Sequence, residues 1–137
     1  MKRVVLLLML VAGAFAGPEA AQSRPDFSGS WIAPDAAALT IQQSGTTMTV
    51  TEGADVKTYN LDGSDRQFSK GNTQYTARAR WVGSALVVAT TTVSSIGTWE
   101  NLEVYSLDYG PKLTVVYVGT QTTRPMMYTK TKTFEKR

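Results

Sequence analysis

The chain has 137 residues, a formal net charge of +3, and neither cysteine nor histidine. Without cysteine there is no disulfide framework, so the fold depends on burial alone. Without histidine or cysteine, Ser-His and Cys-His nucleophilic systems are excluded, as are zinc or copper sites built on imidazole or thiolate. Carboxylate chemistry and oxygen-ligated cations remain.

The N-terminus has the pattern of a secretion signal. Lys2 and Arg3 precede an apolar run at residues 4–11, and residues 14–16 form an A-x-A cleavage site. The run is shorter than the ~18–20 residues that a membrane-spanning helix needs. We therefore expect residues 1–16 to be removed and the protein to be exported to a periplasm or the exterior, with no membrane span. Loss of Lys2 and Arg3 leaves a net charge of about +1, which gives no reason to expect nucleic-acid binding.

The rest of the chain reads as one domain of short strands. Residues 17–25 have no apolar periodicity and predict a flexible mature N-terminus, and the domain occupies residues 26–137. Alternation of apolar and polar residues, with many Thr, Val and Tyr, indicates strands. We expect them at residues 27–33, 39–43, 46–51, 56–61, 73–82, 85–94, 98–107, 112–120 and 126–134, with a short extra pairing at 67–68. Residues 35–38 could form one helical turn, and a bulge near Lys57 would explain why Val56 is out of phase.

The loops between these strands are short, which predicts antiparallel neighbours in chain order, an up-and-down meander. A meander of this length removes both of its exposed edges by closing on itself. The expected fold is therefore an all-β barrel of about eight strands.

The first strand carries a motif. Phe27, Gly29 and Trp31 share one face, which should turn to the interior. The segment FSGSW resembles the F-x-G-x-W signature of calycins, the superfamily of lipocalins and fatty-acid-binding proteins. With LTIQQSG, YNLDG, WVGSAL and YTK further along, the chain is similar to small exported bacterial proteins of lipocalin-like type. The resemblance implies that Trp31 closes one end of the barrel under a basic residue; Arg124 matches by position, and Lys130 is the alternative.

Two arginines in the segment 73–82 allow two interpretations. If the face carrying Tyr75 and Trp81 looks inward, Arg78 and Arg80 face solvent. In the opposite register both guanidinium groups would point into the barrel and grip a carboxylate, as internal arginines do in fatty-acid-binding proteins. Because two buried cations without partners are costly, we favour the outward placement.

The acidic residues do not suggest catalysis. Glu100 and Glu103 are three apart on a strand and face opposite sides, so they cannot form the carboxylate pair of a glycoside hydrolase. Asp55, Asp62 and Asp65 lie in or beside turns, where aspartate is expected for backbone reasons. No spacing resembles a metal-binding loop. We expect no enzymatic activity, cofactor or metal.

The resulting interpretation is an exported monomer that binds a small apolar or amphipathic ligand in the barrel mouth. The alternative is a filled barrel that binds another protein or a cell-surface polymer through its loops. A closed cavity of ~300 Å³ or more would favour the first, and a core without voids the second. Candidate ligand-binding residues are Arg78, Arg80, Trp81, Trp99, Tyr117, Arg124 and Tyr128.

Overall fold

The computed structural model describes residues 24–121 and 126–137. These residues form ten antiparallel strands. The strands are β1 (Gly29–Ala33), β2 (Ala36–Gln43), β3 (Thr47–Glu52), β4 (Asp55–Asn60), β5 (Asp65–Lys70), β6 (Thr73–Val82), β7 (Ala85–Ser94), β8 (Gly97–Asp108), β9 (Lys112–Gln121) and β10 (Met126–Lys136). Each expected strand is present with slightly different ends. The short pairing expected at 67–68 is the complete strand β5, so the barrel has ten strands and not about eight.

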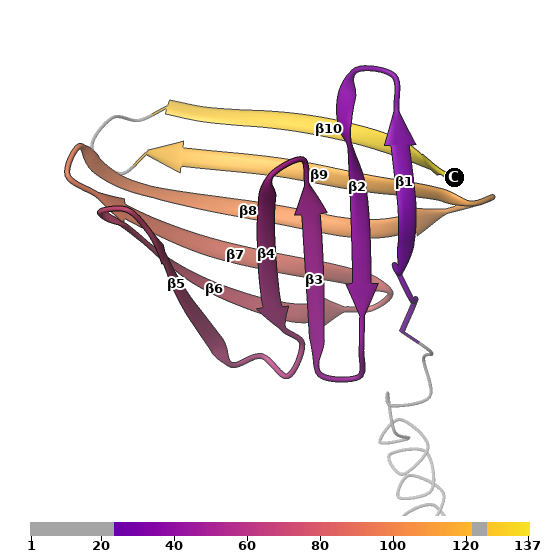
Figure 1. The fold of residues 1–137 in the computed structure, drawn as a ribbon, viewed down its shortest axis with the longest axis horizontal. Coiled ribbons are helices and arrows are strands. Elements are labelled where there is room, and N and C mark those ends of the chain that lie inside the picture. The colour runs from indigo at the N-terminus through magenta and orange to yellow at the C-terminus, as the bar shows by residue number, and fades with distance from the viewer. Residues whose placement is uncertain (1–23, 122–125) are drawn as a thin grey trace, which may run out of the picture.

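The strands follow one another as an up-and-down meander, as predicted. Each strand pairs with the next in the chain except at β4 and β5, and β1 also pairs with β10. The β1–β10 ladder sets Trp31 opposite Lys136 and Ile32 opposite Glu135. The result is a nearly closed barrel with one seam, between β4 and β5 (Figure 1).

Side chains, rather than a backbone ladder, bridge this seam. At one end the Asn60 amide nitrogen donates to Ser64 Oγ at 3.1 Å and to the Asp65 carbonyl at 3.3 Å, and Arg66 Nη1 donates to Asn60 Oδ1 at 3.2 Å. At the other end Lys70 Nζ lies 3.0 Å from Asp55 Oδ1. The facing edges of β4 and β5 are therefore linked only at their ends.

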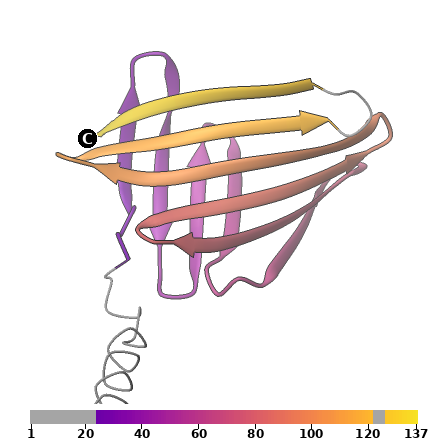
Figure 2. The same ribbon diagram turned by 180° about the vertical axis from the view of Figure 1, so that it is seen from behind.

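The barrel is flattened into two crossing layers. The short strands β1–β4 run across the long strands β6–β10 and pack on one part of their inner face (Figure 1). The view from behind shows that the long strands continue past β4, toward the turn that joins β7 to β8 (Figure 2). One half of the long-strand layer is covered, and strands β1–β4 do not extend over the other half.

The core lies where the two layers cross. Its buried apolar side chains come from both layers: Phe27, Trp31, Leu39, Ile41, Met48, Val50, Tyr59, Leu61, Ala77, Ala79, Leu86, Val88, Tyr105, Leu113, Val115 and Phe134. Burial of this set supplies the main driving force for folding, at roughly 25 cal/mol per Å² of apolar surface. Within the described ranges, no helix has the length and apolar character of a membrane span.

Trp31 is in the core, as expected, with 2% of its surface exposed. Its Nε1 donates to the Phe27 carbonyl at 2.9 Å, and Lys136 Nζ lies 5.6 Å from the centre of its rings. A Cβ on Gly29 would come within 2.9 Å of Lys136 Cε, so glycine is what admits the lysine. The basic residue over Trp31 is thus Lys136. The proposed alternative Lys130 was wrong, because the β1–β10 register brings the end of β10 to β1, and Arg124 lies outside the described residues.

Two local expectations were wrong. The helical turn at 35–38 is absent, since Pro34 and Asp35 form a turn and Ala36 begins β2. No bulge is needed near Lys57, because β4 pairs regularly with β3 and Val56 simply faces outward, 62% exposed. The register irregularity lies instead between Trp31 and Ala33, in the β1–β2 pair.

Candidate functional site

The uncovered half of the long strands forms a cleft of about 240 Å³. Its walls come from both layers of the barrel. The lining residues are Glu52 and Lys57 from β3 and β4, and Tyr75, Thr90, Thr92, Asn101, Leu102, Glu103, Tyr117, Val118 and Tyr128 from β6–β10. Most of these side chains are hydroxyl-bearing, amide or charged, in contrast to the apolar core beside them.

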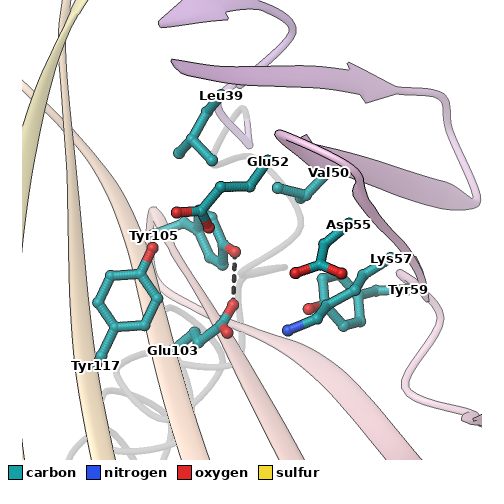
Figure 3. Close-up of a pocket in the computed structure, with 9 residues that line it drawn as sticks. All are labelled: Leu39, Val50, Glu52, Asp55, Lys57, Tyr59, Glu103, Tyr105 and Tyr117. Atoms are coloured by element: carbon teal, nitrogen blue, oxygen red, sulfur yellow. Dashed lines mark hydrogen bonds between the residues drawn. The ribbon is translucent and has the colours of Figure 1, made fainter. Parts of the chain in front are cut away.

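At its inner end the cleft narrows to a pocket of about 40 Å³ that reaches the core. Figure 3 shows this pocket, with Tyr59, Tyr105 and Tyr117 around it and charged side chains entering from both layers. The lining residues are Leu39, Val50, Glu52, Asp55, Lys57, Tyr59, Glu103, Tyr105 and Tyr117. Cleft and pocket share Glu52, Lys57, Glu103 and Tyr117, so they form one continuous site.

Two of the acidic groups in the pocket are already paired with a lysine. Glu52 Oε1 lies 3.3 Å from Lys132 Nζ, and that ammonium also lies 5.1 Å from the centre of the Tyr117 ring. Asp55 pairs with Lys70 across the seam at 3.0 Å. These carboxylates are therefore neutralised within the protein.

The other two charges in the pocket have no ion-pair partner within 4.0 Å among the described residues. Glu103 Oε2 accepts a hydrogen bond from the Tyr105 hydroxyl at 2.6 Å (Figure 3). Within residues 24–121 and 126–137, no basic nitrogen lies within 4.0 Å of the Glu103 carboxylate, and no carboxylate oxygen lies within 4.0 Å of Lys57 Nζ. Glu103 comes from β8 and Lys57 from β4, so opposite charges line opposite walls of the site.

The pocket tyrosines are held in their neutral form. Burial raises the pKa of Tyr59 and of Tyr105 well above the ordinary value of a phenol, and the nearby Glu103 carboxylate adds to both shifts. The pKa of Tyr117 is raised by the same two causes. A phenol of ordinary pKa is already a hydrogen-bond donor at neutral pH, so the raised pKa values extend this state of the three hydroxyls to more alkaline pH.

A glycine shapes the outer wall of the cleft. The Tyr128 ring on β10 lies across Gly119 on β9, where an added Cβ would come within 2.1 Å of Tyr128 Cε1. The Tyr128 hydroxyl donates to Asn101 Oδ1 on β8 at 3.2 Å. Gly119 therefore lets one aromatic side chain span three strands, although 58% of Tyr128 is still exposed.

A second, wider groove lies on the seam and has a volume of about 480 Å³. Phe68 and Tyr75 stack there at 4.8 Å between ring centres. Tyr75 and Lys57 line both this groove and the cleft, so the seam borders the site.

The arginine hypothesis is settled by the orientation of β6. Ala77 and Ala79 are buried, whereas Arg78 and Arg80 are exposed, so the outward placement is confirmed and the inward one was wrong. Arg78 Nε lies 2.7 Å from Asp65 Oδ1. Neither arginine lines the cleft.

The other predicted site residues are divided between cleft and core. Tyr117 and Tyr128 line the cleft. The Trp81 ring stacks on Phe27 at 5.8 Å between ring centres, and the Arg24 guanidinium lies 5.5 Å from the centre of the Trp81 ring. Trp81 therefore packs against the core and does not line the cleft. Trp99 is half-buried on β8 but does not line the cleft.

The sequence interpretation did not include Lys57 and Glu103, two oppositely charged residues of the pocket, among the ligand-binding candidates. Glu103 shares the inward phase of β8 with Tyr105, and this alternation was a usable signal. Glu100 is exposed on the opposite face of β8, and the expectation that the two glutamates face opposite sides is confirmed. Lys57 could not be placed in the same way, because its position opposite Glu103 depends on how β4 crosses the long strands.

In the part of the chain that the structure describes, no group of three or more acidic side chains is arranged to hold a metal ion. No family model matches the chain, and no curated protein matches it. The fold and the geometry of the cleft are therefore the basis for the functional argument.

Proposed function

We propose that this is an exported, non-catalytic protein of calycin-like type that binds a small amphipathic ligand in the cleft. Neither the 40 Å³ pocket nor the cleft is the closed cavity of ~300 Å³ that was set as the mark of a carrier. The observation that carries the proposal is instead the open cleft of about 240 Å³ beside the inner half of β6–β10, lined from both layers. Ligand sites are typically such concave surfaces, with aromatic walls and a few placed polar groups. The leader-like N-terminus supports export.

The ligand would lie in the cleft and not inside the core. The pocket that reaches the core holds only about 40 Å³, which is room for a few water-sized groups. The core itself is filled by buried side chains such as Trp31 and Phe134. A purely apolar ligand would gain little here, because most of the cleft wall is polar.

The chemistry of the wall favours a ligand with both an apolar and a polar part. Tyr75, Tyr117 and Tyr128 offer ring faces for the apolar part. Asn101 and the neutral tyrosine hydroxyls offer hydrogen bonds to the polar part. Binding would desolvate the first and orient the second.

Binding is favoured over hydrolysis even though Glu52 and Glu103 line one pocket. A hydrolytic pair needs one carboxylate free to act as base or nucleophile and one acid to protonate the leaving group. Glu52 is held in an ion pair with Lys132, and Glu103 accepts a hydrogen bond from Tyr105. Both carboxylates are therefore already engaged by other side chains of the protein.

Native mass spectrometry of the protein purified from its own host tests this function. A co-purified small molecule is expected on the wild type. Thr92→Trp, which fills the cleft from β7, should remove it without unfolding the protein. Thr91→Trp, on the opposite face of the same strand, is the matched control and should retain it. A bare mass for the wild type would contradict the proposal.

A second candidate function is a binding module that meets a protein or a polymer through its turns. Its support is the filled core, together with exposed apolar residues at both ends of the barrel, Ile96 at 78% and Tyr109 at 104% exposure. Substituting each by serine should abolish partner capture under this reading and leave small-molecule binding unaffected.

A further inference from the structure

The unpaired charges of Lys57 and Glu103 define the kind of polar head that the cleft accepts. We infer that the ligand is a small zwitterion of the amino-acid type, with its ammonium group on Glu103 and its carboxylate on Lys57. This inference rests on the proposed function, since it names the chemistry of a ligand in the same cleft.

Glu103 has the geometry of an ammonium acceptor. One of its oxygens, Oε2, takes the Tyr105 hydroxyl hydrogen bond, and an ionised carboxylate has further lone pairs to offer. Tyr117 on β9 is the strand-pairing partner of Glu103 on β8, and its side chain lines both the pocket and the cleft. Lys132 Nζ already lies 5.1 Å from the centre of that ring, so the attraction for a ligand ammonium comes from the Glu103 carboxylate.

Lys57 has the complementary role on the opposite wall. Glu52 and Asp55 also line the pocket and are each engaged by another lysine, at 3.3 and 3.0 Å, while the Lys57 charge makes a smaller contribution to lowering the pKa of Asp55. Its own ammonium carries three donors and lies beyond 4.0 Å from every carboxylate of the described residues. A ligand carboxylate would satisfy those donors without displacing an existing ion pair.

The separation of the two charges favours a single zwitterionic ligand. Lys57 and Glu103 both line the 40 Å³ pocket (Figure 3) and form no ion pair with each other within 4.0 Å. A head group that carries both charges can fill this gap and complete both contacts. The adjoining 240 Å³ cleft then receives the rest of the molecule, and its tyrosines favour an apolar or aromatic substituent.

The test uses three probes that share one phenethyl tail: phenylalanine, phenethylamine and 3-phenylpropanoate. The second lacks the carboxylate and the third lacks the ammonium group. Calorimetric titration of the purified chain at neutral pH should give the tightest binding for phenylalanine. Loss of either charge should weaken binding by about tenfold, the usual effect of one charge-assisted hydrogen bond.

Two variants assign each charge to its residue. Glu103→Gln should abolish the preference for phenylalanine over 3-phenylpropanoate and preserve the preference over phenethylamine. Lys57→Met should do the reverse. Glu100→Gln, on the outer face of β8, and Lys112→Met, exposed on β9, are matched controls that should change neither preference.

The outcomes separate this inference from the proposed function. If all three probes bind equally well and Thr92→Trp weakens all three, the cleft binds ligands but the inference of a zwitterion is overturned. If no probe binds at millimolar concentration, the inference is likewise overturned, and the co-purified molecule of the previous experiment decides the function separately. The wild-type comparison needs no variant, so a variant that fails to fold does not prevent the test.

Discussion

The covered and uncovered halves of the barrel are built from the same long strands but differ in their inner face. On β7 the inward residues change from Leu86 and Val88 in the covered half to Thr90 and Thr92 in the cleft. On β8 they change from Tyr105 to Glu103 and Asn101. The change occurs where β1–β4 no longer lie over the long strands (Figure 2). Polarity along a single inward face thus records where the second layer ends.

The largest expected effect comes from removing a tryptophan of the covered half. Trp31→Ala deletes a side chain that is 2% exposed and should lower the free energy of unfolding by about 3–5 kcal/mol, because the closed core cannot collapse around the cavity. Guanidinium denaturation measures the change. Trp99→Ala, at a half-buried position of the uncovered half, is the control and should cost less than half as much. Equal losses would show that the two halves do not differ in packing.

The second effect concerns Tyr59 and Tyr105, which line the 40 Å³ pocket between the core and the cleft. The pKa of Tyr59 and Tyr105 is raised in the folded state, so their contribution to stability is complete below the unfolded pKa of about 10 and is lost as the pH rises above it. Each should lower the free energy of unfolding by about 1.4 kcal/mol per pH unit in that range. Denaturation at a series of alkaline pH values, with tyrosinate absorbance, follows this loss.

Tyr105→Phe sharpens the alkaline experiment. The variant removes one ionisable group. The free energy of unfolding should therefore fall less steeply with pH, by the contribution of one tyrosine. It also removes the only hydrogen bond recorded for Glu103 among the described residues, so its stability at neutral pH should be somewhat lower. If the decline of the free energy of unfolding with pH were equally steep in the variant, Tyr105 would ionise as a solvent-exposed tyrosine does. The pocket around it would then be more accessible to water than its burial indicates.

A smaller effect is expected at the outer wall of the cleft. Gly119→Ala would push the Tyr128 ring off Gly119 and away from Asn101, a loss of about 0.2–1 kcal/mol for a cross-strand contact. In a Tyr128→Ala background the same substitution should become neutral or stabilising, because alanine suits a strand better than glycine. A double-mutant cycle in stability measures the coupling. Purely additive effects would show that the ring does not depend on the glycine.

The sequence predicted the meander well because alternation and turn residues are local. The pattern of β6 left two registers open, and the outward arginines were favoured because two buried cations without partners are costly, a placement that the structure confirms. Strand β5 was underestimated because it is polar and largely exposed, with only Phe68 partly buried. An edge strand that packs on so little carries no strong pattern.

The parts that escaped prediction depend on long-range register. Lys136 covers Trp31 because β10 pairs with β1 at its last residues, and no local motif specifies that pairing. In the same way, the cleft required knowing how far β1–β4 extend over the long strands. Glu103 could be placed on an inward face from the sequence, but whether that face was core or cleft could not be known.

The smallest expected effect is at the seam, where the barrel depends on exposed side chains. Lys70→Met removes the ion pair with Asp55, whose side chains are 76% and 63% exposed, so screening by water and salt should leave the denaturation midpoint unchanged. The hydrogen bond from Lys70 lowers the pKa of Asp55, so whatever the pair contributes is present at neutral pH and lost as the pH falls through that pKa.

Hydrogen exchange is the sensitive measurement here, because β4 and β5 share no backbone ladder and local opening does not require global unfolding. Exchange in β4 and β5 should accelerate while β7 and β8 remain protected. If the variant lost protection in β7 and β8 as well, this surface ion pair would be needed to keep the whole barrel closed. The packing of β1–β4 on the long strands would then not be sufficient to hold the covered half together.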